Sequence, residues 1–222
     1  MSNSFFSQPQ YAACYPNHLQ LPQSRSVFEV REASSGIQEL QSLYPRLVQS
    51  AGQLAATITE LDSQDGFVAV AAATDPLTGS ADDLAGVMAV LEHMPKFKTH
   101  YLIDRRLGVK FSDHHRRDTD RALKFGAFAE ESMEVVLGEW LSLYGNLVKR
   151  HVIAAPFSSE WFRQLSRTIG LKFYSHRHEG RLIAAAIWAI DGPRAYYMFS
   201  AAEPEGYRVG SHYGLVDIAV TK

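Results

Sequence analysis

Apolar and polar positions near the C-terminus predict three consecutive strands. Residues 171–178 (LKFYSHRH) alternate as a half-buried strand does, and a Glu-Gly turn follows them. Residues 181–190 (RLIAAAIWAI) are almost wholly apolar, which is typical of a strand covered on both faces. After an Asp-Gly-Pro breaker, residues 194–200 (RAYYMFS) predict a third strand that is rich in aromatic residues.

Beyond these strands the pattern predicts a polar loop and then a helix. Residues 203–206 (EPEG) predict an irregular stretch, and Gly210-Ser211 offers an N-cap for a helix over residues 211–219. The N-terminus of a helix beside a sheet presents free N–H groups and a positive dipole end, which favour an anionic phosphate group. This turn is therefore a candidate phosphate-binding position.

Helical periodicity predicts several helices upstream. The clearest covers residues 131–150, and a shorter one over 159–169, capped by Ser158, is expected to bury Ile169 with other apolar residues. Further helices are predicted at residues 35–48, 80–94 and 113–124, and Ser112 is expected to cap the last of them. Short strands are predicted at residues 27–31, 54–61, 67–74 and 97–103, the third of them buried. The sequence thus predicts a mixed α/β fold.

Composition excludes several classes of protein. The chain has 222 residues, 46% of them hydrophobic and 21% charged, which is ordinary for a soluble globular protein. No apolar run approaches the roughly 18 to 20 residues of a membrane span, and the N-terminus has no signal-peptide pattern, so we expect cytoplasmic residence. A lone cysteine, Cys14, excludes an internal disulfide and a cysteine-based zinc site.

Charge is concentrated in one segment. Residues 96–124 hold nine Lys/Arg against four Asp/Glu, whereas residues 1–95 hold three against ten. A phosphate-bearing ligand would be attracted to such a segment. The alternative is a solvated helix in which Arg and Asp form ion pairs at a spacing of four.

Two stretches resemble a known group of enzymes. The sequence HEGRLIAAAIWAIDGPRAYYMFSAAEPEGYRVGSHYGL is similar to the C-terminal acyltransferase domain of the Fem-type (FemAB-like) peptidyltransferases, in the GNAT superfamily of N-acyltransferases. The sequence FSDHHRRDTDRALKFG is similar to the Ser and His-Arg-Arg segment of the same group. Arginyl- and leucyl-transferases that act on protein N-termini carry a similar stretch. The resemblance covers roughly residues 97–218.

This resemblance implies an α/β (α+β) fold with a mixed central sheet and flanking helices. We expect an extended N-terminal segment over 1–26, a GNAT-like half over 27–124 and an acyltransferase half over 125–222. Relatives continue through further strands beyond the position of Lys222, so the last strands of the sheet are expected to be missing. The fold then closes differently, a partner subunit of a homodimer supplies the edge, or the chain is incomplete and inactive.

The resemblance also implies transfer of an acyl or aminoacyl group to an amine. Such a reaction needs a base for the ammonium, an acid for the leaving group and donors for the oxyanion. Glu203 or His212 would be the base and Tyr197 or Tyr213 the acid, with backbone N–H groups near Ser200 and Ala201 as oxyanion donors. The alternative is that one tyrosine belongs to the core and that His212 merely begins a helix.

The donor and acceptor are predicted only by class. Arg208, Gly210 and Ser211 would bind the donor's phosphates, and the spacing of Arg and glycines departs from the usual coenzyme A loop. The donor is therefore acyl-CoA or aminoacyl-tRNA, with no permanently bound cofactor. An amine acceptor, or the acceptor end of a tRNA, would bind at the basic helix through His115, Arg116, Arg117 and Arg121.

Two further expectations concern the site. His176 and His178 could chelate a metal, but no third ligand stands at a diagnostic spacing, so we expect no metal and two surface histidines. The second functional hypothesis is a non-catalytic binding or scaffold protein. If the chain is an enzyme, the strands over 182–190 and 194–200 should splay beside the 211–219 helix and leave a cleft lined by Tyr197, Glu203 and His212.

Overall fold

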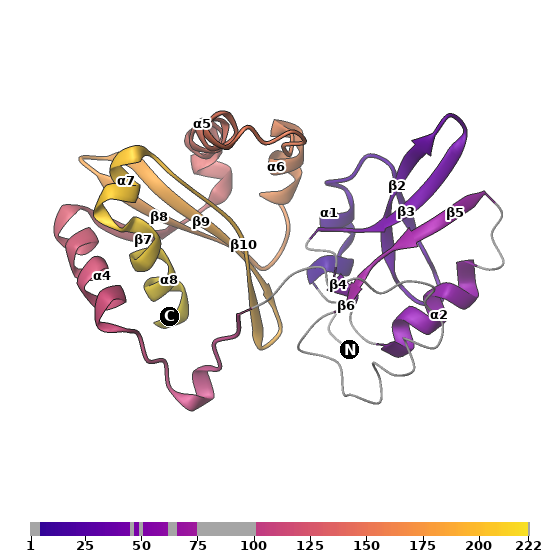
Figure 1. The fold of residues 1–222 in the computed structure, drawn as a ribbon, viewed down its shortest axis with the longest axis horizontal. Helices are drawn as coiled ribbons and strands as arrows, with labels where there is room; N and C mark the ends of the chain where they lie inside the picture. The colour runs from indigo at the N-terminus through magenta and orange to yellow at the C-terminus, as the bar shows by residue number, and fades with distance from the viewer. Residues whose placement is uncertain (1–4, 45–46, 49–50, 62–65, 75–100, 222) are drawn as a thin grey trace. The chain divides into compact units, whose positions relative to one another are not determined.

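The computed structural model describes residues 5–44, 47–48, 51–61, 66–74 and 101–221, and these form two compact units (Figure 1). One unit comprises residues 1–5 and 102–222, and the other comprises residues 6–101. The division falls at residue 101, whereas the sequence placed a boundary near residue 125. Helix α4 (Asp113–Phe125) packs against α8 (Ser211–Thr221), which keeps residue 125 inside the larger unit.

The smaller unit is built on a four-stranded sheet in the order β1-β2-β3-β5, in which β3 and β5 are parallel and the other neighbours antiparallel. Leu21, Phe28, Leu40 and Leu61 form its core. Strands β4 and β6 form a separate parallel pair, and β4 contacts helix α2. The elements of this unit are η1 (Phe5–Ser7), α1 (Pro9–Ala12), β1 (His18–Gln20), β2 (Val27–Ser34), β3 (Ile37–Ser42), β4 (Leu47–Val48), α2 (Ala51–Leu61), β5 (Phe67–Ala71) and β6 (Ala73–Thr74).

Two predictions of secondary structure in this unit are wrong. The stretch from residue 35 was expected to be helical, but Gly36 takes a positive φ of 75° and turns the chain back, so that β2 and β3 pair. Residues 54–61 were expected to be a strand and instead belong to α2. In this helix Leu54, Thr57 and Leu61 are buried at the helical spacing of three and four residues. This spacing favours a helix more strongly than the run of apolar residues favours a strand.

Other expectations for this unit differ from the structure in detail. The segment 1–26, expected to be extended, contains a 3-10 turn, the short helix α1 and strand β1. Residues 67–74 form strands as predicted, but Val68 and Val70 on β5 are exposed rather than buried. The predicted helix 80–94 and most of the predicted strand 97–103 lie outside the described residues.

The larger unit is built on an antiparallel four-stranded sheet in the order β10-β9-β8-β7, flanked by helices (Figure 1). Phe173 packs on Trp140 of α5, whereas its neighbour Tyr174 packs with Leu215 of α8. Successive residues of a strand point to opposite faces, so α5 and α8 cover different faces of the sheet. The elements are η2 (Arg105–Leu107), α4, β7 (Ala127–Glu131), α5 (Met133–His151), α6 (Ser159–Leu165), β8 (Leu171–His178), β9 (Arg181–Asp191), β10 (Arg194–Ala202), α7 (Pro204–Val209) and α8.

The sequence predicted this unit more closely. The three strands of the hairpins, the helices at α4 and α5 and the helix at α8 are confirmed, as are the serine caps of α4 and α6. Three details are corrected. Residues 203–206 enter a helix, because Pro204 occupies its first position; α6 ends at Leu165, which leaves Ile169 71% exposed; and strand β7 was not predicted.

Candidate functional site

The junction of β10, α7 and α8 brings together polar side chains from distant parts of the chain. Asn146 on α5 donates a hydrogen bond of 3.0 Å from Nδ2 to Oε1 of Glu203. Four residues on, one helical turn away, Arg150 donates from Nη1 to the carbonyl oxygen of Ala202 at 3.2 Å. The Arg150 guanidinium also lies 5.0 Å from the centre of the Tyr207 ring. Helix α5 is thereby held against the end of β10 and the start of α7.

Of the predicted catalytic residues, His212 borders this group and Tyr197 lies on β10, whose end the group contacts. The ring centroid of His212, at the start of α8, lies 5.0 Å from that of Tyr207, and burial lowers the pKa of the His212 imidazole. Tyr197 on β10 is 44% exposed and packs against Trp188 with ring centroids 4.9 Å apart, and partial desolvation of its hydroxyl raises the pKa. At neutral pH His212 is therefore neutral and able to accept a proton, while Tyr197 keeps its proton and can donate it.

Asn146, Arg150 and Tyr207 were not singled out from the sequence. Helix α5 was interpreted only through its apolar stripe, although Asn146 and Arg150 stand four residues apart on one helix side. Tyr207 directly follows residues 203–206, which were expected to be irregular. The spacing of Asn146 and Arg150 on α5 could have marked them as a pair. Their partners could not be predicted, because no local pattern gives the position of β10 relative to α5.

The predicted phosphate turn lies against other elements of the same unit. Ser211 is fully buried, and its Oγ lies 2.7 Å from Nδ1 of His176 on β8. Gly210 has a φ of 82°, and a Cβ added there would meet Cβ of Asp118 on α4 at 3.1 Å. Arg208 is exposed and lies 3.6 Å from Oε1 of Glu205. A role for these residues in phosphate binding remains a prediction.

Tyr213 faces helix α4 rather than His212. Its hydroxyl lies 3.1 Å from Nε2 of His114, and its ring meets that of His115 edge-on at 5.0 Å between centroids. Three consecutive residues at the start of α8 therefore have three different surroundings: Ser211 contacts β8, His212 contacts α7 and Tyr213 contacts α4. Tyr213 therefore lies at helix α4, on a different side of α8 from His212.

The basic helix α4 is largely paired within itself. Arg116 forms an ion pair with Asp113, and Nη2 of Arg121 lies 2.7 Å from Oδ1 of the buried Asp118. Arg121 also donates from Nε to the carbonyl oxygen of Val209 at 3.3 Å, which links α4 to the end of α7. His115 stacks on Phe111, and Arg117 is exposed. A substrate-binding role for this helix remains a prediction.

Strands β9 and β10 were expected to splay, and this expectation is wrong. They pair from Asp191 and Arg194 at the hairpin to Ala184 and Ala202 at the far end, interrupted only by a bulge after Tyr197. Ala201 is fully buried within this pairing and Ser200 is partly buried. A cleft formed by separation of these two strands is therefore excluded.

The two strand histidines are not surface residues. His176 is fully buried, stacks on Phe128 at 4.0 Å and has its pKa lowered to about 4 by burial. His178 donates from Nδ1 to the carbonyl oxygen of Phe125 at 2.6 Å. Among the described residues, no three His, Cys, Asp or Glu side chains gather so that they could hold a metal ion. Within the same ranges, no helix has the length and apolarity needed to span a bilayer.

Comparison with known proteins finds one family model and one solved structure that are similar to parts of this chain. Residues 110–218 match the sequence model of a family described as an acetyltransferase (GNAT) domain. A solved structure, the C-terminal domain of a candidate lysylphosphatidylglycerol synthetase from Agrobacterium fabrum, matches with a TM-score of 0.58 and 10% sequence identity, over 96% of this chain and 67% of that one. No curated protein matches the chain by sequence. The GNAT-like α/β fold is thereby confirmed, whereas the narrower FemAB-like resemblance stays a prediction.

Proposed function

Residues 110–218 match a GNAT acetyltransferase domain, and from this premise we propose that the protein is an N-acyltransferase. It transfers an acyl or aminoacyl group from an activated donor to an amine. The proposal is carried by the junction at the start of α8, where the neutral His212 lies beside Tyr207, and Arg150 and Asn146 of α5 link Tyr207 to the end of β10 and to the carboxylate of Glu203. Acyl transfer to nitrogen requires these types of group.

The reaction is a substitution at the carbonyl carbon of the donor. His212 accepts a proton from the ammonium of the acceptor, and the free amine nitrogen then forms a bond to the carbonyl carbon. The bond from that carbon to the leaving group breaks, and Tyr197 gives its proton to the leaving atom. The nitrogen then loses its second proton, which restores the Tyr197 hydroxyl, and the proton on His212 passes to solvent. Glu203, held by Asn146, attracts the cationic acceptor to the junction.

The chemical class of the donor is proposed on weaker grounds. Gly210 and Ser211 are buried, so the side chain of Arg208, which is exposed on α7, is the better contact for a donor phosphate. The similar solved structure is named for a lysyl group joined to phosphatidylglycerol. For this reason aminoacyl-tRNA is retained as a candidate donor together with acyl-CoA.

A non-catalytic binding protein is the second candidate. The continuous pairing of β9 and β10 favours it, because the cleft expected for an enzyme does not open between these strands. In such a protein the cluster around His212 would fix α5 and α7 to the sheet, and its substitution would change stability without a loss of turnover.

Turnover by the purified full chain distinguishes the two candidates. We would measure thiol release from acetyl-CoA and a long-chain acyl-CoA, and transfer of a labelled amino acid from aminoacyl-tRNA, with a panel of primary amines. His212→Gln is expected to lower kcat/KM on the order of 100-fold, as loss of a general base does. The matched control is His151→Gln at the exposed end of α5, which should leave the rate unchanged. No turnover with any donor, and no rise in melting temperature with any donor, would contradict acyl transfer.

A further inference from the structure

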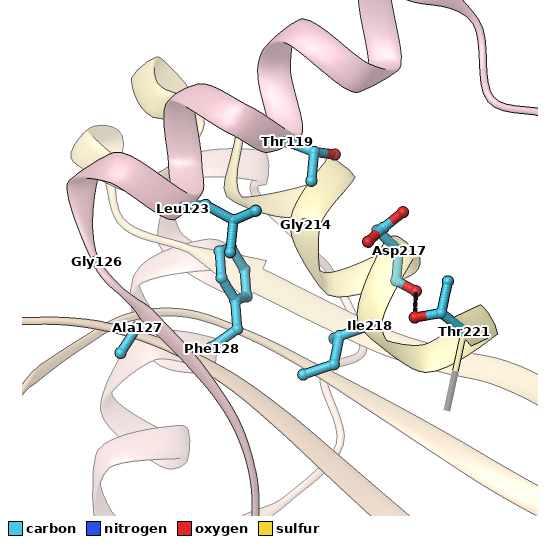
Figure 2. A pocket seen from close by; sticks show the side chains of 9 residues that line it. All are labelled: Thr119, Leu123, Gly126, Ala127, Phe128, Gly214, Asp217, Ile218 and Thr221. Atoms are coloured by element: carbon cyan, nitrogen blue, oxygen red, sulfur yellow. Dashed lines mark hydrogen bonds between the residues drawn. The ribbon is translucent and has the colours of Figure 1, made fainter.

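A hollow lies on the opposite side of α8 from His212. It has a volume of about 670 Å³ and is bordered by α4, the start of β7 and the C-terminal half of α8 (Figure 2). An α-helix turns roughly 100° per residue, which places Gly214, Asp217 and Ile218 roughly opposite His212 on α8. The hollow is thus separate from the candidate catalytic cluster.

One wall of the hollow carries a buried hydroxyl without a partner. Thr119 on α4 is only 6% exposed, and its Oγ1 makes no hydrogen bond to any residue that the structure describes. A threonine inside a helix commonly donates to the carbonyl four residues earlier, so an unsatisfied hydroxyl at this position is unusual. Buried polar atoms without partners are uncommon in folded proteins, and a bound ligand is one way of satisfying them.

A carboxylate, that of Asp217, lines the same hollow as this hydroxyl. In Figure 2 the side chains of Thr119 and Asp217 lie toward the same end of the hollow, and that of Phe128 lies lower. The carbonyl oxygen of Asp217 accepts a hydrogen bond of 2.7 Å from Thr221, which anchors the last turn of α8. Within the described residues, the Asp217 carboxylate makes no ion pair.

The other part of the hollow is apolar and firmly held. Phe128 on β7 stacks on the buried His176 with ring centroids 4.0 Å apart. Gly214 allows α8 to lie directly on this ring, because a Cβ at that position would stand 2.3 Å from Cζ of Phe128. Leu123, which is 55% exposed, and Ile218 add apolar surface beside it. A carboxylate and a hydroxyl thus stand beside an apolar surface of fixed shape.

We propose that this hollow binds an amphipathic primary amine. The ammonium group donates hydrogen bonds to the carboxylate of Asp217 and to Oγ1 of Thr119, and the apolar part lies against Phe128, Leu123 and Ile218. An ammonium has three donors and a positive charge, which suits a carboxylate and an unpartnered hydroxyl oxygen. An anionic amphiphile would be repelled by Asp217. The inference is independent of the proposed function, because it uses no residue of the catalytic cluster.

Calorimetric titration of the full chain with octylamine hydrochloride at neutral pH tests this site, with sodium octanoate as the anionic comparison. We expect saturable binding of octylamine at one site and no binding of octanoate. Asp217→Asn is expected to weaken octylamine binding at least tenfold, and Thr119→Val severalfold. The matched control is Asp120→Asn, which removes an exposed carboxylate of α4 outside the hollow and should leave binding unchanged.

A further variant tests the site if Asp217→Asn or Thr119→Val fails to fold. Leu123→Lys places a cation at an exposed position of the hollow, so it should abolish octylamine binding while the melting temperature without ligand stays the same. The proposal is overturned if octylamine shows no saturable binding, if octanoate binds equally well, or if a folded Asp217→Asn variant binds octylamine as the natural chain does.

Discussion

At the residue scale, His212 and Tyr197 have pKa values displaced in opposite directions. Burial lowers the pKa of His212 from its ordinary 6.5 and raises that of Tyr197 from its ordinary 10. A base must be neutral and an acid protonated, so both groups are in the required form across the whole neutral range.

The pH profile of kcat/KM should reflect this. As the pH falls, the rate is expected to be lost only below 6.5, where His212 becomes protonated, and as the pH rises it should hold until above 10. In His212→Gln the loss on the acid side should disappear. A profile centred near 6.5 in both proteins would remove His212 from the role of base.

The buried His176 makes a separate prediction about stability. Its pKa is about 4 in the folded chain and 6.5 in the unfolded chain, so between these values the unfolded state binds more protons. The contribution of His176 to the free energy of unfolding is therefore complete above pH 6.5. It decreases by about 3 kcal/mol in total as the pH falls toward 4.

Denaturant unfolding at pH 7.5 and pH 5 measures this contribution. The natural chain should lose about 2 kcal/mol more than His176→Leu between the two pH values, because the variant has no group to protonate at this position. Equal losses in the two proteins would show that His176 titrates normally.

At the element scale, the contact between α8 and β7 depends on one glycine. Alanine is normally favoured over glycine inside a helix by about 1 kcal/mol. At Gly214, however, the added methyl would overlap the ring of Phe128. Gly214→Ala is expected to destabilise the chain by about 1 to 3 kcal/mol, as overpacking does.

Helix α5 provides the matched control. A Cβ at Gly145 would meet nothing within 4 Å, and the residue lies inside the helix, so Gly145→Ala is expected to stabilise the chain by about 0.5 to 1 kcal/mol. Chemical denaturation of both variants gives the comparison. Changes of the same sign would contradict the close packing of α8 on β7.

At the scale of the whole molecule, each compact unit has its own hydrophobic core. Leu40 belongs to the core of the unit 6–101, and Leu215 to the core of the larger unit on the α8 side of its sheet. Units with separate cores can unfold separately. Scanning calorimetry is therefore expected to resolve two transitions.

Truncation in each core assigns the transitions. Leu40→Ala should lower one midpoint and Leu215→Ala the other, each variant losing about 2 to 5 kcal/mol in its own unit. A single transition that both substitutions shift would show that the chain unfolds as one cooperative body.

The sequence by itself determined much of the larger unit. Strands β8, β9 and β10, helices α4, α5 and α8 and two serine caps follow from spacings within a few residues, and such spacings act locally. The motifs around Tyr197, Glu203 and His212 likewise identified a stretch that the structure brings together with α5. Local patterns were weaker in the smaller unit, where the apolar positions after Ser34 suit a helix and a hairpin equally well.

Tertiary structure decided the rest. Gly36 and the pairing of β2 with β3 select the hairpin, and the packing of α5 on β10 brings Asn146 and Arg150 to Glu203 and Tyr207. The hollow beside Thr119 exists only because α4, β7 and α8 meet. The reason is physical: a period of two or 3.6 residues specifies which face of an element is apolar, but which element covers that face depends on contacts between residues far apart in the chain.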